Sequence, residues 1–111
     1  MAKLERELIG DFDEILSHLE DVILSGSLSA SLEDASDFRE DNARCSVRVI
    51  ERYSMVGKNR LSLTLTLFQV GEKIHLSAIT SGGSQAVFFK MNTWGEEAFL
   101  DVVADAIDHL P

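Results

Sequence analysis

Two stretches of the chain carry apolar residues at the spacing of an amphipathic helix. In residues 11–24 the apolar side chains recur at intervals of three and four, which places them on one helical face. Residues 94–109 repeat the pattern, and Thr93 with Glu96 has the spacing of a capping box. Gly26 is expected to end the first helix in a left-handed conformation. The sequence therefore predicts two helices, each with one buried face.

Most of the remaining chain alternates apolar and polar residues, as strands with one buried face do. The alternation is clearest at residues 61–67, where four leucines are separated by hydroxyl side chains. Turns at residues 57–59 and 71–72 predict two hairpins around this strand. The acidic, polar residues 31–43 are predicted to form the main loop. The predicted strands are residues 2–9, 28–32, 44–53, 61–67, 73–80 and 85–90.

The two helices need a covering surface, and the alternating strands offer one apolar face for both of them. At 111 residues with 45% hydrophobic composition, the chain can build one core. We therefore expect a single domain over residues 1–111. Its predicted fold class is α+β, a two-layer sandwich with an antiparallel sheet of about five to six strands and two helices on one face, in β-α-β4-α order.

The composition excludes several classes of function. No apolar stretch approaches the ~20 residues that span a bilayer, and the N-terminus is too charged for a signal peptide, so we expect a cytoplasmic protein without a membrane partner. A net charge of −9 makes nucleic acid an unfavourable partner. The lone Cys45 is expected to be a buried, reduced thiol. His18, His75 and His109 have no metal-ligand spacing, and we expect no metal or cofactor.

Charge is distributed unevenly along the chain. The two predicted helices hold ten carboxylates and no Lys or Arg, whereas residues 44–60 hold five cations and one carboxylate. In the strand at residues 44–53 the smaller apolar side chains are predicted to face the helices, which would leave the arginines on the open face. The helix layer is thus predicted to be acidic and the open sheet face basic. The side chains assigned to the open face are Arg44, Arg48 and Arg52, with His75 from the strand at residues 73–80.

These side chains make the open face a candidate binding surface. A cationic surface with small hydroxyls could accept an anionic ligand, an acidic peptide or the same face of a second subunit. The alternative is an ordinary solvated sheet face, in which arginine and threonine serve solubility and strand propensity.

A glycine turn and an aromatic helix start form a second candidate site. Ser81, Gly82, Gly83 and Ser84 could form an anion-binding nest of backbone amides, although a plain loop between strands accounts for the same residues. Trp94 stands at the predicted start of the second helix and could contact a ligand or partner. No serine lies in a nucleophile elbow and no catalytic constellation emerges.

Five blocks of the sequence carry a resemblance to a known family. The most specific are Thr-Ser-Gly-Gly-Ser-Gln at residues 80–85 and Asn-Thr-Trp-Gly-Glu-Glu at residues 92–97. The other blocks are residues 29–34, 44–49 and 59–63. The chain resembles an uncharacterised family of short bacterial proteins, classed as a domain of unknown function. That resemblance implies a bacterial cytosolic protein and assigns no functional residues. The predicted topology is also similar to TATA-binding-protein-like and helix-grip folds.

Two functions remain open at this point. The first is a non-enzymatic binding or protein-interaction module, a homodimer, that acts through its basic sheet face or the glycine turn and Trp94. The second is a helix-grip-like carrier or enzyme that holds a small apolar or anionic molecule between the second helix and the sheet.

Overall fold

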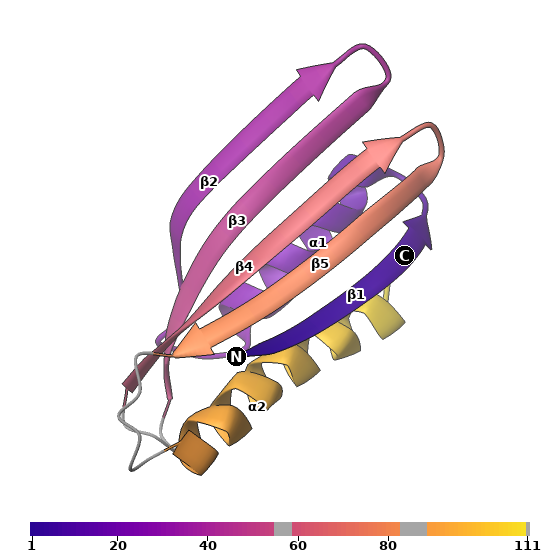
Figure 1. The fold of residues 1–111 in the computed structure, drawn as a ribbon. Helices are drawn as coiled ribbons and strands as arrows, with labels where there is room; N and C mark the ends of the chain where they lie inside the picture. Colours follow the sequence, from indigo (N-terminus) through magenta and orange to yellow (C-terminus); the bar gives the residue numbers. More distant parts are fainter. Residues whose placement is uncertain (55–58, 83–88, 111) are drawn as a thin grey trace.

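The computed structural model describes residues 1–54, 59–82 and 89–110, with side chains described except at residues 54 and 89–93. It contains five strands and two helices (Figure 1). In chain order these are β1 (Ala2–Ile9), α1 (Phe12–Ser25), β2 (Ser31–Glu40), β3 (Ala43–Ser54), β4 (Asn59–Val70), β5 (Lys73–Gly82) and α2 (Phe89–Asp108).

The strands form one open antiparallel sheet in the order β1-β5-β4-β3-β2. Both helices cover the same face of this sheet, and α2 lies near β1 at one edge (Figure 1). The two helices also contact each other, because His18 Nε2 lies 3.0 Å from the carbonyl oxygen of Ala106. The predicted α+β fold class, with the β-α-β4-α order, is confirmed.

The core lies between the helices and the inner face of the sheet. Leu61, Leu63, Leu65 and Leu67 of β4 are 0% exposed, as the alternation predicts. The helices meet them with Leu19 and Ile23 from α1 and with Phe99 and Val103 from α2, all of them buried. Removing each such side chain from water stabilises the fold by about 1.5–3 kcal/mol, so β4 is the best-anchored strand of the sheet.

Helix α1 begins where the sequence predicts and ends differently. The side chain of Asp11 caps the helix by accepting a hydrogen bond from the backbone N–H of Glu14 at 2.9 Å. Gly26 has a φ of −74°, so the predicted left-handed ending is wrong. The Gly26 N–H instead donates to the carbonyl oxygen of Ile23, and a turn follows.

The region between α1 and β3 corrects two further predictions. Residues 28–32 do not form a separate strand, since the chain turns at residues 28–29, Leu28 lies fully in solvent, and residues 31–32 are the start of β2. The predicted loop at residues 31–43 is instead largely β2, which pairs with β3 along its whole length. The strand gave no alternation signal because none of its side chains is buried.

The second helix is longer than predicted. It begins at Phe89, so the predicted strand at residues 85–90 is wrong at its end, and residues 83–88 lie outside the described part of the chain. Thr93 lies inside α2 and cannot cap its start. Glu96 is 4% exposed and its carboxylate lies 2.5 Å from the amino group of Met1, so its role is to hold the start of β1 against α2.

Candidate functional site

The predicted faces of β3 are wrong. β3 pairs with β4 so that Arg48 lies opposite Leu65 and Arg52 lies opposite Leu61. Residues opposite each other in an antiparallel pair share a face, and these leucines are buried beneath the helices. The arginines of β3 therefore lie on the helix-covered face. The residues that occupy the open face instead are Cys45, Val47 and Val49.

Long aliphatic stems explain why arginine can occupy this inner face. From the inner face, the guanidinium groups of Arg44 and Arg48 reach carboxylates on α1 and β2. The guanidinium carbon of Arg44 lies 3.9 Å from the centre of the Phe12 ring, and that of Arg52 lies 4.4 Å from the Phe99 ring. Burial lowers the pKa of Arg52. These arginines attach β3 to the helices and do not form an open basic surface.

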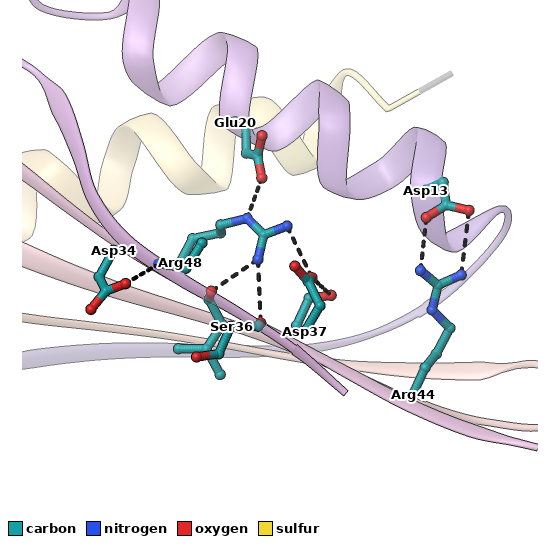
Figure 2. Close-up of polar contacts among 10 residues, drawn as sticks. Asp13, Glu20, Asp34, Ser36, Asp37, Arg44 and Arg48 are labelled. Atoms are coloured by element: carbon teal, nitrogen blue, oxygen red, sulfur yellow. Dashed lines mark hydrogen bonds and ion pairs between the residues drawn. The ribbon is translucent and has the colours of Figure 1, made fainter. Parts of the chain in front are cut away.

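Arg48 is the centre of the most extensive polar network among the described residues (Figure 2). Its Nε donates to Glu20 of α1 at 2.5 Å, and its Nη2 lies 3.0 Å from Asp37 of β2. Its Nη1 donates to the backbone carbonyl oxygens of Ser36 and Val47 at 3.3 and 3.0 Å. The side chain is 11% exposed. One guanidinium group therefore joins α1, β3 and β2.

The pKa shifts of this network reflect its hydrogen bonds. Burial alone would lower the pKa of Arg48, but the hydrogen bonds to Glu20 and Asp37 outweigh it and raise the pKa. The pKa of Asp37 is lowered, chiefly by the hydroxyl of Ser46, which donates to it at 2.6 Å, and further by Arg48. Arg48 and Asp37 therefore stay ionised at neutral pH.

A second ion pair lies further along β3 (Figure 2). Both terminal nitrogens of Arg44 donate to the carboxylate of Asp13 on α1, at 2.8 and 3.3 Å. The hydrogen bond from Arg44 lowers the pKa of Asp13. Sequence reasoning had separated an acidic helix layer from a basic sheet face, and in the structure these opposite charges meet between the layers.

The open face of the sheet is apolar and hydroxyl-bearing at its centre. Its central strands carry Cys45, Val47 and Val49 from β3 beside Thr64 and Thr66 from β4, all of them partly exposed. Larger apolar side chains surround this centre and are 37–67% exposed. They are Phe38 on β2, Tyr53 on β3, Phe68 on β4 and Ile79 on β5.

His75 lies on this open face, as predicted, but far from the arginines, which lie on the other side of the sheet. Its ring stacks with that of Phe68 at a centroid distance of 6.2 Å and an interplanar angle of 28°. Its Nδ1 is 4.0 Å from the Glu7 carboxylate. The three side chains border a hollow of about 410 Å³, which Glu5, Thr66 and Ser77 also line.

The remaining predicted site residues do not form one cluster in the described structure. Ser81 pairs with Ser62 on the open face, next to Gly82 at the end of β5. A Cβ atom at Gly82 would lie 2.6 Å from the Leu61 side chain, so packing accounts for this glycine. Gly83 and Ser84 lie outside the described residues. Trp94 is on α2 and is 58% exposed.

Several residues of these surfaces were missed by sequence reasoning. Asp37 and Phe38 lie in the region predicted as a loop, and Glu20 was counted only among the ten carboxylates of the predicted helices. Among residues 1–54, 59–82 and 89–110, no group of three His, Cys, Asp or Glu side chains could hold a metal ion. None of the described helices is both long and apolar enough to cross a membrane.

Together these features define a small α+β protein with an open, partly apolar sheet face and a layer of helices tied to the sheet by ion pairs. The chain belongs to the family described as "Family of unknown function (DUF6054)", whose model matches residues 1–111. No curated protein and no solved structure matches the chain. The similarity to helix-grip folds therefore stays a prediction.

Proposed function

We propose that this chain is a non-enzymatic protein-interaction module that binds a second copy of itself through the open face of its sheet. The observation that carries the proposal is the set of exposed apolar side chains on that face. Phe38 of β2 and Phe68 of β4 lie level with each other on either side of Cys45, and Ile79 of β5 lies further along the sheet, opposite Thr64. An exposed apolar patch with a polar rim is characteristic of protein interfaces.

The size of the face fits a dimer. Five strands about 4.8 Å apart, with roughly nine residues each at about 3.4 Å per residue, cover roughly 700 Å². Two copies packed face to face would bury about 1,400 Å², within the range of about 1,200–2,000 Å² for stable interfaces.

The placement of charge supports the same arrangement. The exposed carboxylates of both helices lie on the side of the molecule opposite the open face, where a face-to-face dimer keeps them far apart. The middle of the open face, by contrast, carries Val47, Val49, Thr64 and Thr66, which have no charge to desolvate. The carboxylates of the two helices therefore do not oppose this particular contact.

The interaction module is favoured over the carrier. The layer between sheet and helices, where a carrier would hold its ligand, is occupied by Phe99, Leu19, Ile23 and Ile50, each at most 1% exposed. The sequence indicated a basic face as the contact surface, and the proposal replaces it with an apolar one. We place the dimer in the bacterial cytoplasm, which suits the unpaired thiol of Cys45 on its contact face.

Light scattering coupled to size-exclusion chromatography tests the dimer. We expect the wild-type protein to have twice the mass of a 12.3 kDa chain, and Phe68→Lys to have the mass of one chain, since it would bury an unpaired charge at the interface. Leu28→Lys is the matched control, because Leu28 is fully exposed in the turn between α1 and β2 and is not part of a strand.

The proposal fails if the wild-type protein is a monomer at about 100 μM, since an interface of this size predicts a dissociation constant well below that value. It also fails if Phe68→Lys leaves the dimer intact, or if Leu28→Lys dissociates it equally. Thermal melts of both variants establish that each is folded.

A further inference from the structure

The outer edge of β2 is a second candidate binding surface, distinct from the open face of the sheet. β2 is the last strand of the sheet, and no described strand lies beside its outer edge. An antiparallel edge strand directs the N–H and C=O groups of alternate residues away from its neighbour. Those groups are a template on which another extended chain can pair.

β2 is unusual in how little holds it. None of its side chains is buried, and residues 32–40 are all exposed. Apart from its backbone pairing with β3, the described contacts that fix it to the rest of the fold centre on Asp37, which binds Arg48 and Ser46. Because β2 buries so little apolar surface, its local detachment from the sheet costs little free energy.

Two backbone irregularities limit the usable edge. The pairing of β2 with β3 shifts register between Leu32 and Asp34. At the other end, Asp41 has a φ of 50°, which turns the chain sharply into β3. Residues 34–40 between these points form the regular part of the strand.

The charge of the strand indicates what kind of chain can pair with it. β2 contains four carboxylates and one guanidinium group, a net charge of −3. Pairing two β2 strands from two copies would bring like charges together across the ladder, which is destabilising. A basic extended segment would instead meet opposite charge. The charged residues are Glu33, Asp34, Asp37, Arg39 and Glu40.

We propose that residues 34–40 are a docking edge for an extended, basic segment of a partner protein, which adds to the sheet beside β2. On the open-face side, its lysine or arginine side chains would lie near Asp34 and Glu40, both of which are exposed. Main-chain hydrogen bonds supply affinity in this binding mode, and alternate side chains supply specificity.

The helix side of the edge favours apolar side chains in the same segment. A cleft of about 370 Å³ opens there between α1 and β2, with the apolar Leu16 in its wall. Three arginines, two aspartates, Phe38 and Ser46 form its other walls, and two of the arginines are already paired to carboxylates. An added basic side chain would meet these guanidinium groups, so an apolar one fits better. The docked segment is therefore one that alternates basic and apolar residues.

A short peptide of alternating lysine and valine is the probe. Fluorescence anisotropy measures the affinity of this peptide for the protein. We expect the bound peptide to slow amide hydrogen exchange in residues 34–40. The double variant Asp34→Lys/Glu40→Lys should bind it about tenfold more weakly. Glu14→Lys/Asp21→Lys is the matched control, because it changes the net charge equally on exposed positions of α1 and should retain most of the affinity.

Three results would overturn the proposal. The first is an equal loss of affinity in both double variants, which would mean non-specific charge attraction. The second is slowed exchange in β1 or on the central strands and not in β2. The third is equally tight binding of a peptide of alternating glutamate and valine. Because Asp34 and Glu40 lie on the open-face side of β2, the peptide assay is run on the Phe68→Lys background, in which a dimer would not cover them. Either proposal can then fail alone.

Discussion

β4 and β2 belong to the same sheet but are held in it by different forces. β4 has neighbours on both edges and four leucines that are 0% exposed. β2 has one neighbour and no buried side chain, and its side-chain anchorage centres on one carboxylate and one guanidinium group. The hydrophobic effect fixes β4, whereas hydrogen bonds and an ion pair fix β2.

This difference predicts a gradient of local stability across the sheet. Local opening costs little free energy where few apolar contacts are lost, and approaches the full unfolding free energy in the core. We therefore expect backbone amides of β4 to exchange only on global unfolding and those of β2 to exchange through local detachment.

The largest expected effect is at β4. Leu65→Ala should lower the free energy of unfolding by about 3 kcal/mol, because it leaves a cavity between the sheet and both helices. Chemical denaturation measures this loss. The neighbouring Thr66→Ala, on the open face, is the control and should cost less than about 1 kcal/mol. Similar losses at the two positions would mean that the sheet has no strongly preferred face.

The next effect is on the attachment of β2. Arg48→Met keeps most of the side-chain stem and removes the contacts to Glu20, Asp37 and the Ser36 carbonyl. We expect a loss of about 1–2 kcal/mol and a much larger rise in amide exchange in β2 than in β4. Arg39→Met, at an exposed position of β2, should change stability by less than about 0.5 kcal/mol. Uniform acceleration of exchange in both strands would contradict a local role for Arg48.

The smallest effect is the response to acid. Because Ser46 and Arg48 lower the folded-state pKa of Asp37, its contribution to stability is present in full above the ordinary value of 3.8 and is lost as the pH falls through the lowered pKa. The Asp37 side chain is 61% exposed, so we expect less than about 1 kcal/mol. Amide exchange in β2, corrected for intrinsic rates, should rise relative to β4 from about pH 5 to about pH 2. In Asp37→Asn that change should be smaller, and an unaltered acid response in this variant would contradict the assignment.

The same contrast explains what the sequence could predict. The alternating leucines of β4 and the apolar stripes of both helices indicate buried faces. The buried residues of these three elements could therefore be predicted from periodicity alone. β2 has no such periodicity because neither of its faces is buried, and its acidic composition is also typical of a loop. Its strand conformation depends on pairing with β3, a non-local interaction that no local pattern encodes.

The error on β3 has a different physical origin. Small apolar residues alternate there with arginines, and arginine is normally the exposed member of such a pair. The inner face is decided by the opposing leucines of β4 and by carboxylates on two other elements. Glu20 and Asp37 bind Arg48 from distant parts of the sequence. The face of the sheet on which each β3 side chain lies could therefore not be predicted before the register of β3 with β4 was known.

The attachment of β2 by backbone pairing with β3 and by the side-chain contacts of Asp37 also bears on how the family can diversify. With Asp37 kept, most positions on this strand can exchange one polar side chain for another without opening a cavity, because none of them fills one. Mutations can therefore change the side chains along the outer edge of β2, while β4 and the helices preserve the fold. β2 is the part of the molecule in which a new binding specificity can evolve at the least risk to folding.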